Sequence, residues 1–302
     1  MYSLFPVPRQ IRYKTKQTRL TYSSLTLFTN CPQLADRFLQ SLSIQNVEVV
    51  TLAHAEDDVF FIRFGAEQVL DCPDQQQGFS LSIGYDSVLL SSRSEQGLFY
   101  GCLAWNQLAE QGKEAGYIQA LELTDWPVLE NRGLMLDISR GRVYTLDYLK
   151  QLTAKLAMLR INVLQLYIEH TFAFSFLADV HQGSDPITAE EIQELDRWCR
   201  QHYIELQANL QSFGHCNRLL TTKGFRHLRE SDLYWTLSPA AEETYTLLDR
   251  MYAEFLPNFS SSVLNIDSDE TYDLGSGKSA SMVEKEGKGE VYLRHLLTLR
   301  EL

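Results

Sequence analysis

Hydrophobic and polar positions follow two different rhythms along the chain. Up to Trp126, short runs rich in β-branched and aromatic residues alternate with polar ones, which is typical of strands. These runs cover residues 24–30, 46–53, 59–65 and 79–92. Helical stretches follow Asn30 and Ser94, and both residues are good N-caps. We therefore expect residues 1–126 to form an α+β domain, an antiparallel sheet with helices on one face.

From Pro127 onward the pattern changes to strand, helix, strand, helix. Hydrophobic runs predict strands at 132–139, 161–169, 203–213 and 262–270. Between them, helices are predicted after Thr145, at a capping box of Thr188 and Glu191, and from Ser238. Parallel strands joined by helical crossovers form either a doubly wound sheet or a (β/α)8 barrel.

Polar or ionisable residues end every one of these strands, which favours the barrel, because barrel enzymes carry their active sites at the strand carboxyl ends. Residues 127–302 supply four strands where a whole barrel has eight. The fold class we expect is therefore α/β, with the α+β domain followed by the first half of a (β/α)8 barrel. Self-association or a companion chain would complete such a barrel.

Composition narrows the partners and the compartment. The 302 residues carry a formal net charge of −12, which disfavours binding to nucleic acid and to anionic membranes. Five cysteines are scattered without a C-x-x-C pair, so reduced thiols are expected. The first residues lack a hydrophobic signal core, and no apolar run is long enough to span a membrane. We expect a cytoplasmic protein.

The strongest chemical signal is an acidic cluster at the end of the fourth predicted strand, made of Asp267, Asp269 and Glu270. Crowded carboxylates raise the pKa of at least one of them. A protonated carboxyl can serve as a general acid while an ionised neighbour stabilises a developing cation. Strand alternation would place Asp269 and Glu270 on opposite faces, so a shared site requires a local departure from the strand. The same cluster is also typical of a solvated loop.

Four segments in order, RGLMLDISRGRVYTLDYLKQL, INVLQLYIEHTFAF, LQSFGH and DSDETYDLGSGKS, resemble family 20 glycoside hydrolases, the β-N-acetylhexosaminidases. FPVPRQIRY and SEQGLFYGCLAWNQL resemble the N-terminal domain of that family. The resemblance implies removal of terminal, non-reducing β-linked GlcNAc or GalNAc with retention. It also implies that the substrate's own 2-acetamido group is the nucleophile, giving an oxazolinium intermediate, and that no cofactor is needed.

The resemblance assigns roles to individual residues. Glu270 matches the general acid/base, and Asp269 matches the residue that orients the acetamido group. Arg132 matches the arginine that binds sugar hydroxyls, His215 matches a histidine near the acid, and Glu169 matches an acidic residue after the second strand. Taken without the resemblance, His215 is also typical of a hydrogen-bonded core histidine.

Two departures from the family pattern support an alternative. Asp267 stands where the family usually has glycine, and the strands that complete the sugar pocket are absent from residues 127–302. The alternative is a catalytically impaired homologue that acts as a carbohydrate-binding or structural remnant.

Two other chemistries fit less well. GSGKS at 275–279 lacks the first glycine of a phosphate-binding loop, because Tyr272 occupies that position, and a flexible loop is expected instead. Asp267, Asp269, Glu270 and His215 could ligate a divalent metal. Neither an H-x-H nor an H-E-x-x-H spacing supports this, so we expect no metal. The tryptophans, including Trp235, are expected to pack in the core.

Overall fold

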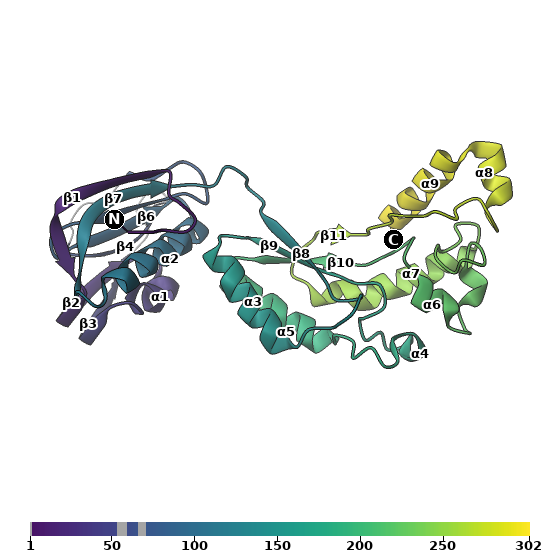
Figure 1. Ribbon diagram of the computed structural model, residues 1–302, viewed down its shortest axis with the longest axis horizontal. Coiled ribbons are helices and arrows are strands. Elements are labelled where there is room, and N and C mark those ends of the chain that lie inside the picture. Colours follow the sequence, from purple (N-terminus) through teal and green to yellow (C-terminus); the bar gives the residue numbers. More distant parts are fainter. Residues whose placement is uncertain (1, 53–58, 66–70) are drawn as a thin grey trace. The chain divides into compact units, whose positions relative to one another are not determined.

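The computed structural model describes residues 2–52, 59–65 and 71–302. The chain forms two compact units, Met1–Arg132 with Met158–Arg160, and Gly133–Ala157 with Ile161–Leu302 (Figure 1). Within the described residues, no helix has the length and apolar character needed to cross a membrane. Residue 53, the last of a predicted strand, lies outside the described residues.

The first unit is built on a seven-stranded sheet of order β1-β7-β5-β6-β4-β2-β3. Its strands are β1 (Gln10–Arg19), β2 (Thr21–Thr29), β3 (Ser43–Thr51), β4 (Phe60–Phe64), β5 (Phe79–Ile83), β6 (Val88–Ser92) and β7 (Tyr117–Asp125). Every pair is antiparallel except β2 with β3. That pair is parallel because the chain crosses over through a short helical segment between the two strands.

Three strand predictions in this unit need correction, one of which is that β7 was not predicted. The run 79–92 is not one strand but two, β5 and β6, joined by a turn in which the N–H of Gly84 donates to the carbonyl of Ser87 at 2.8 Å. The edge strand β1 was not predicted, because its side chains are mostly polar and exposed and show no apolar alternation. Lysine-rich edges of this kind discourage pairing with other sheets.

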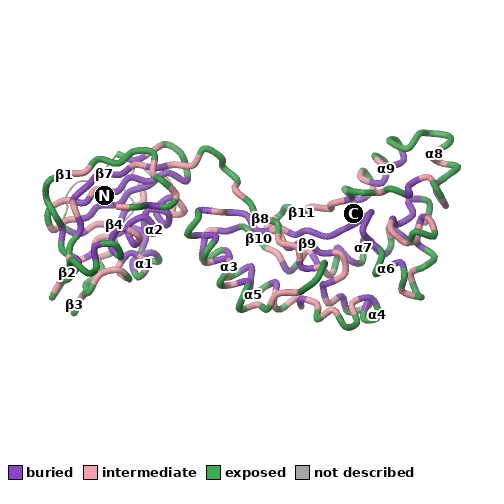
Figure 2. Tube along the Cα trace, viewed as in Figure 1, coloured by how far each residue is buried: buried purple, intermediate pink, exposed green. Residues whose placement is uncertain are grey.

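Helix α2 (Glu95–Gly112) packs against β5, β6 and β7 and is buried on nearly every side, as Figure 2 shows. Its predicted cap is confirmed, since the Ser94 hydroxyl accepts the N–H of Gly97 at 3.0 Å. Trp105 stacks on Phe38 of α1 (Ala35–Leu39) with ring centroids 5.3 Å apart. Burial on several sides explains why the apolar positions of α2 do not form a single stripe.

Asn30 is not the helix cap that its position suggested. The first helical residues there are the 3-10 turn η1 (Pro32–Leu34), which follows Cys31 without a side-chain cap. The Asn30 side chain instead donates to the carbonyl of Val59 and accepts the N–H of Phe61, each at 2.8 Å. The Asn30 side chain therefore connects two neighbouring segments of the chain and does not cap a helix.

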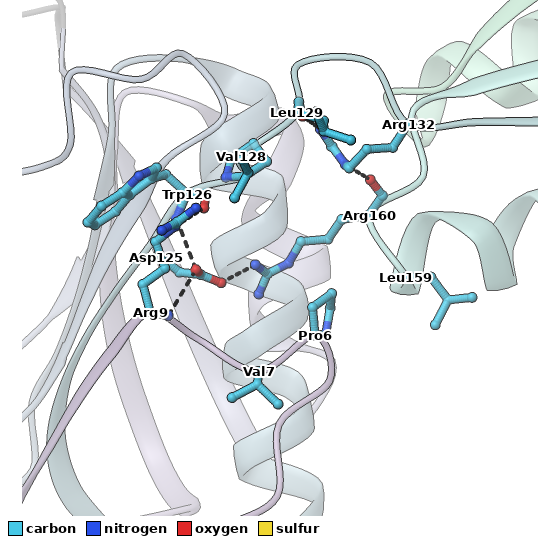
Figure 3. Close-up of a pocket in the computed structure, with 11 residues that line it drawn as sticks. Pro6, Val7, Arg9, Asp125, Trp126, Val128, Leu129, Arg132, Leu159 and Arg160 are labelled. Carbon is cyan, nitrogen blue, oxygen red and sulfur yellow. Dashed lines mark hydrogen bonds and ion pairs between the residues drawn. The ribbon is translucent and has the colours of Figure 1, made fainter.

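A buried ion pair links the end of β7 to the Arg160 side chain. The Asp125 carboxylate pairs with the Arg160 guanidinium and also accepts the N–H groups of Arg9 and Trp126 at 3.1 and 3.0 Å (Figure 3). Only 4% of the Asp125 side chain and 10% of the Arg160 side chain are exposed. These residues line a pocket of about 390 Å³, in which the carboxylate is already neutralised by its partner.

The second unit is a four-stranded, all-parallel sheet of order β11-β10-β9-β8. Its strands are β8 (Gly133–Asp137), β9 (Val163–Tyr167), β10 (Glu205–Asn209) and β11 (Leu264–Asn265). Its α-helices are α3 (Leu146–Met158), α4 (Ala178–His181), α5 (Ala189–Gln201), α6 (Asn217–Thr221), α7 (Glu242–Phe255), α8 (Ala280–Glu286) and α9 (Lys288–Glu301), and its 3-10 turns are η2 (Arg226–Leu228) and η3 (Leu256–Asn258). Sequential parallel strands with helical crossovers form part of a (β/α)8 barrel.

Two of the three predicted helix starts in this unit are confirmed. Thr188 and Glu191 form both bonds of the capping box, and the Thr145 hydroxyl accepts the N–H of Tyr148 at 3.3 Å. The third is wrong, because α7 begins at Glu242 and not at Ser238. The Ser238 hydroxyl donates instead to the Glu230 carboxylate at 2.8 Å. Helices α8 and α9 were not predicted.

Replacing Asp125 by alanine should destabilise the first unit by about 3 kcal/mol, because Arg160 would remain buried without its counter-charge. Urea unfolding followed by circular dichroism measures the change. Glu122→Ala is a matched control that breaks the exposed pair of Glu122 with Lys14 and should cost less than about 1 kcal/mol. Equal losses in the two variants would contradict the assigned importance of the buried pair.

Candidate active site

The acidic cluster lies in the loop that follows β11, where the backbone leaves the extended conformation. Strand β11 ends at Asn265, and φ is positive at Asp267 (53°), Ser268 (72°) and Glu270 (48°). Left-handed residues break the two-residue alternation of a strand. This is the local departure that the sequence requires, and it turns the adjacent side chains of Asp269 and Glu270 toward one partner.

That partner is His215, in the loop after β10. Its Nε2 lies 3.4 Å from Oδ2 of Asp269 and 3.2 Å from Oε2 of Glu270, and its Nδ1 lies 3.5 Å from Oε1 of Glu169. The imidazole is 6% exposed, whereas the side chains of Asp269 and Glu270 are 59% and 48% exposed. The structure thus brings four of the five predicted site residues together, with a buried histidine beneath two accessible carboxyls.

Close backbone contact holds the two loops in place. A Cβ on Gly214 would collide with the carbonyl oxygen of Asp269, so only glycine allows the loops to approach this closely. The ring centroids of Trp235 and His215 are 4.4 Å apart, and the Trp235 indole N–H donates to the carbonyl of Glu270 at 2.8 Å. Trp235 was expected to pack in the core, but it is only partly buried and packs against the site itself, which the sequence did not indicate.

A chain of hydrogen bonds joins Glu169 to Asp269. The Tyr167 hydroxyl donates to Glu169 at 2.9 Å, and the Gln211 amide donates to the Tyr167 oxygen at 3.1 Å and to Asp269 Oδ1 at 2.7 Å. Burial raises the pKa of the Glu169 carboxyl. The sequence analysis missed Tyr167 and Gln211, although Tyr167 precedes Glu169 by the two-residue spacing that places both on one strand face.

Asp267 is set apart from the other two carboxyls. Its Oδ1 accepts a weak hydrogen bond from the Asn209 amide at 3.4 Å, and its buried Oδ2 has no hydrogen-bond partner within the described residues. Burial, and secondly the charge of Asp269, raises the pKa of Asp267 to about 7. The crowding expected from the sequence therefore acts on Asp267. Asp267 also does not join the group of His215, Asp269 and Glu270, whose potential ligand atoms lie within 4.8 Å of one another.

Arg132 is not brought to this cluster. It precedes the first residue of β8, whereas the cluster follows the carboxyl ends of the strands. Its guanidinium donates to the carbonyls of Arg160, Leu129 and Glu130 and to side-chain oxygens of Gln77 and Tyr100. Residues at the two ends of a strand lie at opposite edges of the sheet, so Arg132 does not converge with the other four predicted residues, and its sugar-binding role stays a prediction.

Arg140 lies at the other end of β8, where Arg132 was expected to act. Its Nε donates to Asp137 at 2.6 Å, and its guanidinium carbon lies 4.8 Å from the centre of the Tyr167 ring. Tyr167 is in turn hydrogen-bonded to Glu169. Burial alone would raise the pKa of Asp137, but bonds from the backbone N–H groups of Arg140 and Ser139 and from the Arg140 side chain lower it. The sequence RGLMLDISR contains both arginines, and only strand direction distinguishes them.

The GSGKS segment is held by an internal carboxylate. The backbone N–H groups of Gly277 and Ser279 donate to Glu230 at 3.1 and 3.0 Å, and the hydroxyls of Ser279 and Ser238 donate to it at 2.8 Å. Glu230 is 2% exposed. The N–H groups that could cradle a phosphate are therefore already bonded, and the segment is anchored rather than the loose loop expected.

Comparison with known proteins agrees with this architecture. Residues 1–126 match the family model described as "Glycosyl hydrolase family 20, domain 2". The β-hexosaminidase subunit alpha of Rattus norvegicus is 26% identical over 211 residues, covering 64% of this chain and 40% of the relative. Hexosaminidase D of Homo sapiens is 25% identical over 162 residues, covering 52% of this chain and 33% of the relative. The chain thus spans less than half the length of these relatives.

Solved structures show the same fold. The chitobiase of Flavobacterium johnsoniae superposes with a TM-score of 0.75 at 17% identity, over 99% of this chain and 51% of that one. An exo-β-N-acetylglucosaminidase of Vibrio harveyi, in complex with N-acetylglucosamine, gives 0.72 at 16% identity, over 99% and 53%. Together with the family match, these structures confirm the resemblance to family 20 and the partial barrel that follows the first domain.

Asp267 should make stability depend on pH. The unfolded carboxyl ionises near its ordinary pKa of 3.8 and the folded one at about 7, so between these values the folded chain binds more protons and loses stability as the pH rises. Asp267→Asn should remove this slope and stabilise the chain by roughly 1–2 kcal/mol at pH 8, a figure reduced for the partial exposure of the group. Asparagine also tolerates the left-handed backbone.

Urea unfolding of both proteins from pH 4 to pH 8 tests this expectation. The exposed Asp249→Asn on α7 is the matched control and should leave the slope unchanged. A pH dependence that is the same in Asp267→Asn as in the parent would contradict the assignment.

Proposed function

We propose, from the family 20 domain that opens the chain and the carboxyl cluster of its second unit, that this protein is a glycosidase. Its substrates would carry a terminal, non-reducing β-linked N-acetylhexosamine. The observation that carries the proposal is the convergence of Asp269 and Glu270 on His215 at the open end of the parallel strands. The names of the rat and human relatives and the N-acetylglucosamine bound by the Vibrio harveyi protein support the sugar class.

Glu270 is proposed as the general acid. It would give its proton to the glycosidic oxygen as the bond to the anomeric carbon breaks, and its carboxylate would later remove a proton from the attacking water. The indole N–H of Trp235 donates to the backbone carbonyl of Glu270, and His215 Nε2 lies 3.2 Å from Oε2 of the Glu270 side chain. These contacts fix the position of the carboxyl while leaving it open to the leaving group.

Asp269 is proposed to hold the nucleophile. The oxygen of the substrate's acetamido group would attack the anomeric carbon, closing a five-membered ring whose nitrogen carries a positive charge. A carboxylate beside that nitrogen aligns the group and offsets the charge. The Gln211 amide fixes Asp269 through Oδ1, which leaves Oδ2 on the side that faces His215.

Turnover by this chain is the first experiment, with purified protein and p-nitrophenyl β-GlcNAc and β-GalNAc as substrates. Release of p-nitrophenol above a p-nitrophenyl β-glucoside control would support the substrate-assisted hydrolase, because the glucoside lacks the acetamido nucleophile. A folded chain that hydrolyses none of the three would instead support the carbohydrate-binding or structural remnant.

Glu270→Gln should lower kcat by about 10²- to 10⁴-fold on chitobiose, whose leaving group must be protonated. In kcat/KM, which reports the step that expels the leaving group, the loss should be much smaller on the p-nitrophenyl glycoside, because nitrophenolate leaves without a proton. Asp269→Asn should instead impair both substrates alike, by about 10²-fold or more, since both use the same nucleophile. Initial rates with each substrate give the comparison.

Glu243→Gln on the exposed face of α7 is the control for these variants and should retain parental rates. The roles would be reversed if Asp269→Asn showed the dependence on the leaving group. They would be lost altogether if both variants kept parental activity.

Arg140 is proposed as the arginine that binds sugar hydroxyls, because it lies at the carboxyl end of β8 and its fork of donors suits a vicinal diol. Arg140→Ala should raise KM by about tenfold or more, because a hydrogen bond that involves a charged group is worth about 1.5–3 kcal/mol. The loss of stability should be small, because the ion pair of Arg140 with Asp137 is largely exposed. Arg132→Ala should do the opposite. It would remove several bonds within the first unit and lower the free energy of unfolding by about 2 kcal/mol without a selective change in KM.

Kinetics and urea unfolding of the two variants separate these roles. A raised KM in Arg132→Ala together with an unchanged KM in Arg140→Ala would contradict the proposal and restore the original assignment of Arg132.

A further inference from the structure

His215 Nε2 lies at the spacing of neighbouring metal ligands from two carboxylate oxygens. In tetrahedral zinc sites the bonds to nitrogen and oxygen are about 2.0–2.2 Å, so neighbouring ligand atoms are roughly 3.3–3.6 Å apart. Nε2 of His215 lies 3.4 Å from Asp269 Oδ2 and 3.2 Å from Glu270 Oε2. Both distances are close to a tetrahedral edge.

The histidine is also unsatisfied in a way that points to a ligand. Its side chain is 6% exposed, yet Nε2 makes no hydrogen bond to any described residue, although two carboxylate oxygens face it. A buried polar atom without a hydrogen bond is costly, and such atoms are rare in folded proteins. Here the atom points into the space between two carboxyls that are open to solvent.

The other side of the imidazole supplies the outer contact that metal-binding histidines use. Nδ1 of His215 lies 3.5 Å from Oε1 of Glu169, which is itself held by the Tyr167 hydroxyl. A carboxylate behind a histidine fixes the ring orientation and its tautomer and strengthens it as a ligand. Glu169, His215 and the exposed carboxyl pair thus have the residue types and the order of a carboxylate–histidine–metal arrangement.

We propose that His215, Asp269 and Glu270 bind a divalent transition-metal ion such as Zn²⁺, with Glu169 as the outer partner, and that the ion blocks the site. The ion would occupy the carboxyl oxygens that otherwise hold the acetamido group and deliver the proton. Sugar and metal therefore compete. This inhibitory consequence rests on the proposed function, whereas the binding of the ion does not.

Isothermal titration of the EDTA-treated, dialysed chain with ZnCl₂ tests binding directly. We expect one equivalent to bind, and MgCl₂ to bind far more weakly, because Mg²⁺ prefers oxygen ligands to imidazole. The five cysteines are all buried, so thiols of the folded chain should not contribute.

His215→Gln should abolish the zinc titration, and Glu169→Gln should weaken it by about 10- to 100-fold as the loss of an outer partner. His227→Gln, which removes an exposed imidazole outside the cluster, is the matched control and should bind zinc like the parent. Circular dichroism confirms that each variant is folded. No zinc binding by the parent, or unchanged binding in His215→Gln, would overturn the proposal.

Hydrolysis of p-nitrophenyl β-GlcNAc with and without zinc then tests the inhibition. When the zinc concentration equals the dissociation constant of zinc, we expect the apparent KM for the glycoside to be raised. EDTA should reverse the effect. A chain that binds zinc but shows no hydrolysis in EDTA would retain the metal site and lose the proposed function. If the chain hydrolyses the glycoside in EDTA, binds no zinc and is not inhibited by it, the proposed function is retained and the metal site is lost.

Discussion

The constraint on which the site depends is that two consecutive carboxyl side chains must face the same partner. An extended strand cannot do this, because successive side chains point to opposite faces. Strand β11 therefore stops at Asn265, and left-handed residues carry the chain through the turn that presents Asp269 and Glu270. Gly214, where a Cβ would collide with the Asp269 carbonyl oxygen, lets the neighbouring loop approach this turn closely and places His215 next to both carboxyls.

Much of the architecture could be predicted because it depends on local signals. The capping box at Thr188, the cap at Ser94 and the order of the parallel strands follow from residue type and spacing. The need for a departure from the strand at Asp269 and Glu270 also follows from alternation alone. Two helix starts were predicted wrongly because the side chain at the expected N-cap bonds to another part of the fold. Asn30 and Ser238 are good caps, but the Asn30 side chain bonds to Phe61 on β4, and the Ser238 hydroxyl bonds to the buried Glu230 carboxylate.

In the candidate site, too, the sequence indicated the residue types but not which of them the fold brings together. Its residue types were recognised, but the choice between Arg132 and Arg140 requires knowing which end of β8 faces the cluster. The spacing rules for metal ligands describe ligands on one helix or one turn, so they say nothing about a group assembled from separate loops. Here the histidine and the carboxyls come from separate loops after β10 and β11, so their meeting appears only when parallel strands are placed side by side.

Asp267 shows how the site tolerates a third acid where a glycine would relieve both backbone and charge. Aspartate can adopt a left-handed conformation, so the turn survives, but the carboxyl is then buried beside Asp269. Raising its pKa to about 7 lets the group remain protonated over much of the acidic range, which removes the repulsion that would otherwise disturb Asp269. Asp267 thereby stays apart from the pair that faces His215 and bonds to Asn209 on the sheet. Neutralising the surplus acid by burial, rather than by pairing it with a cation, leaves the open side of the cluster free for a ligand.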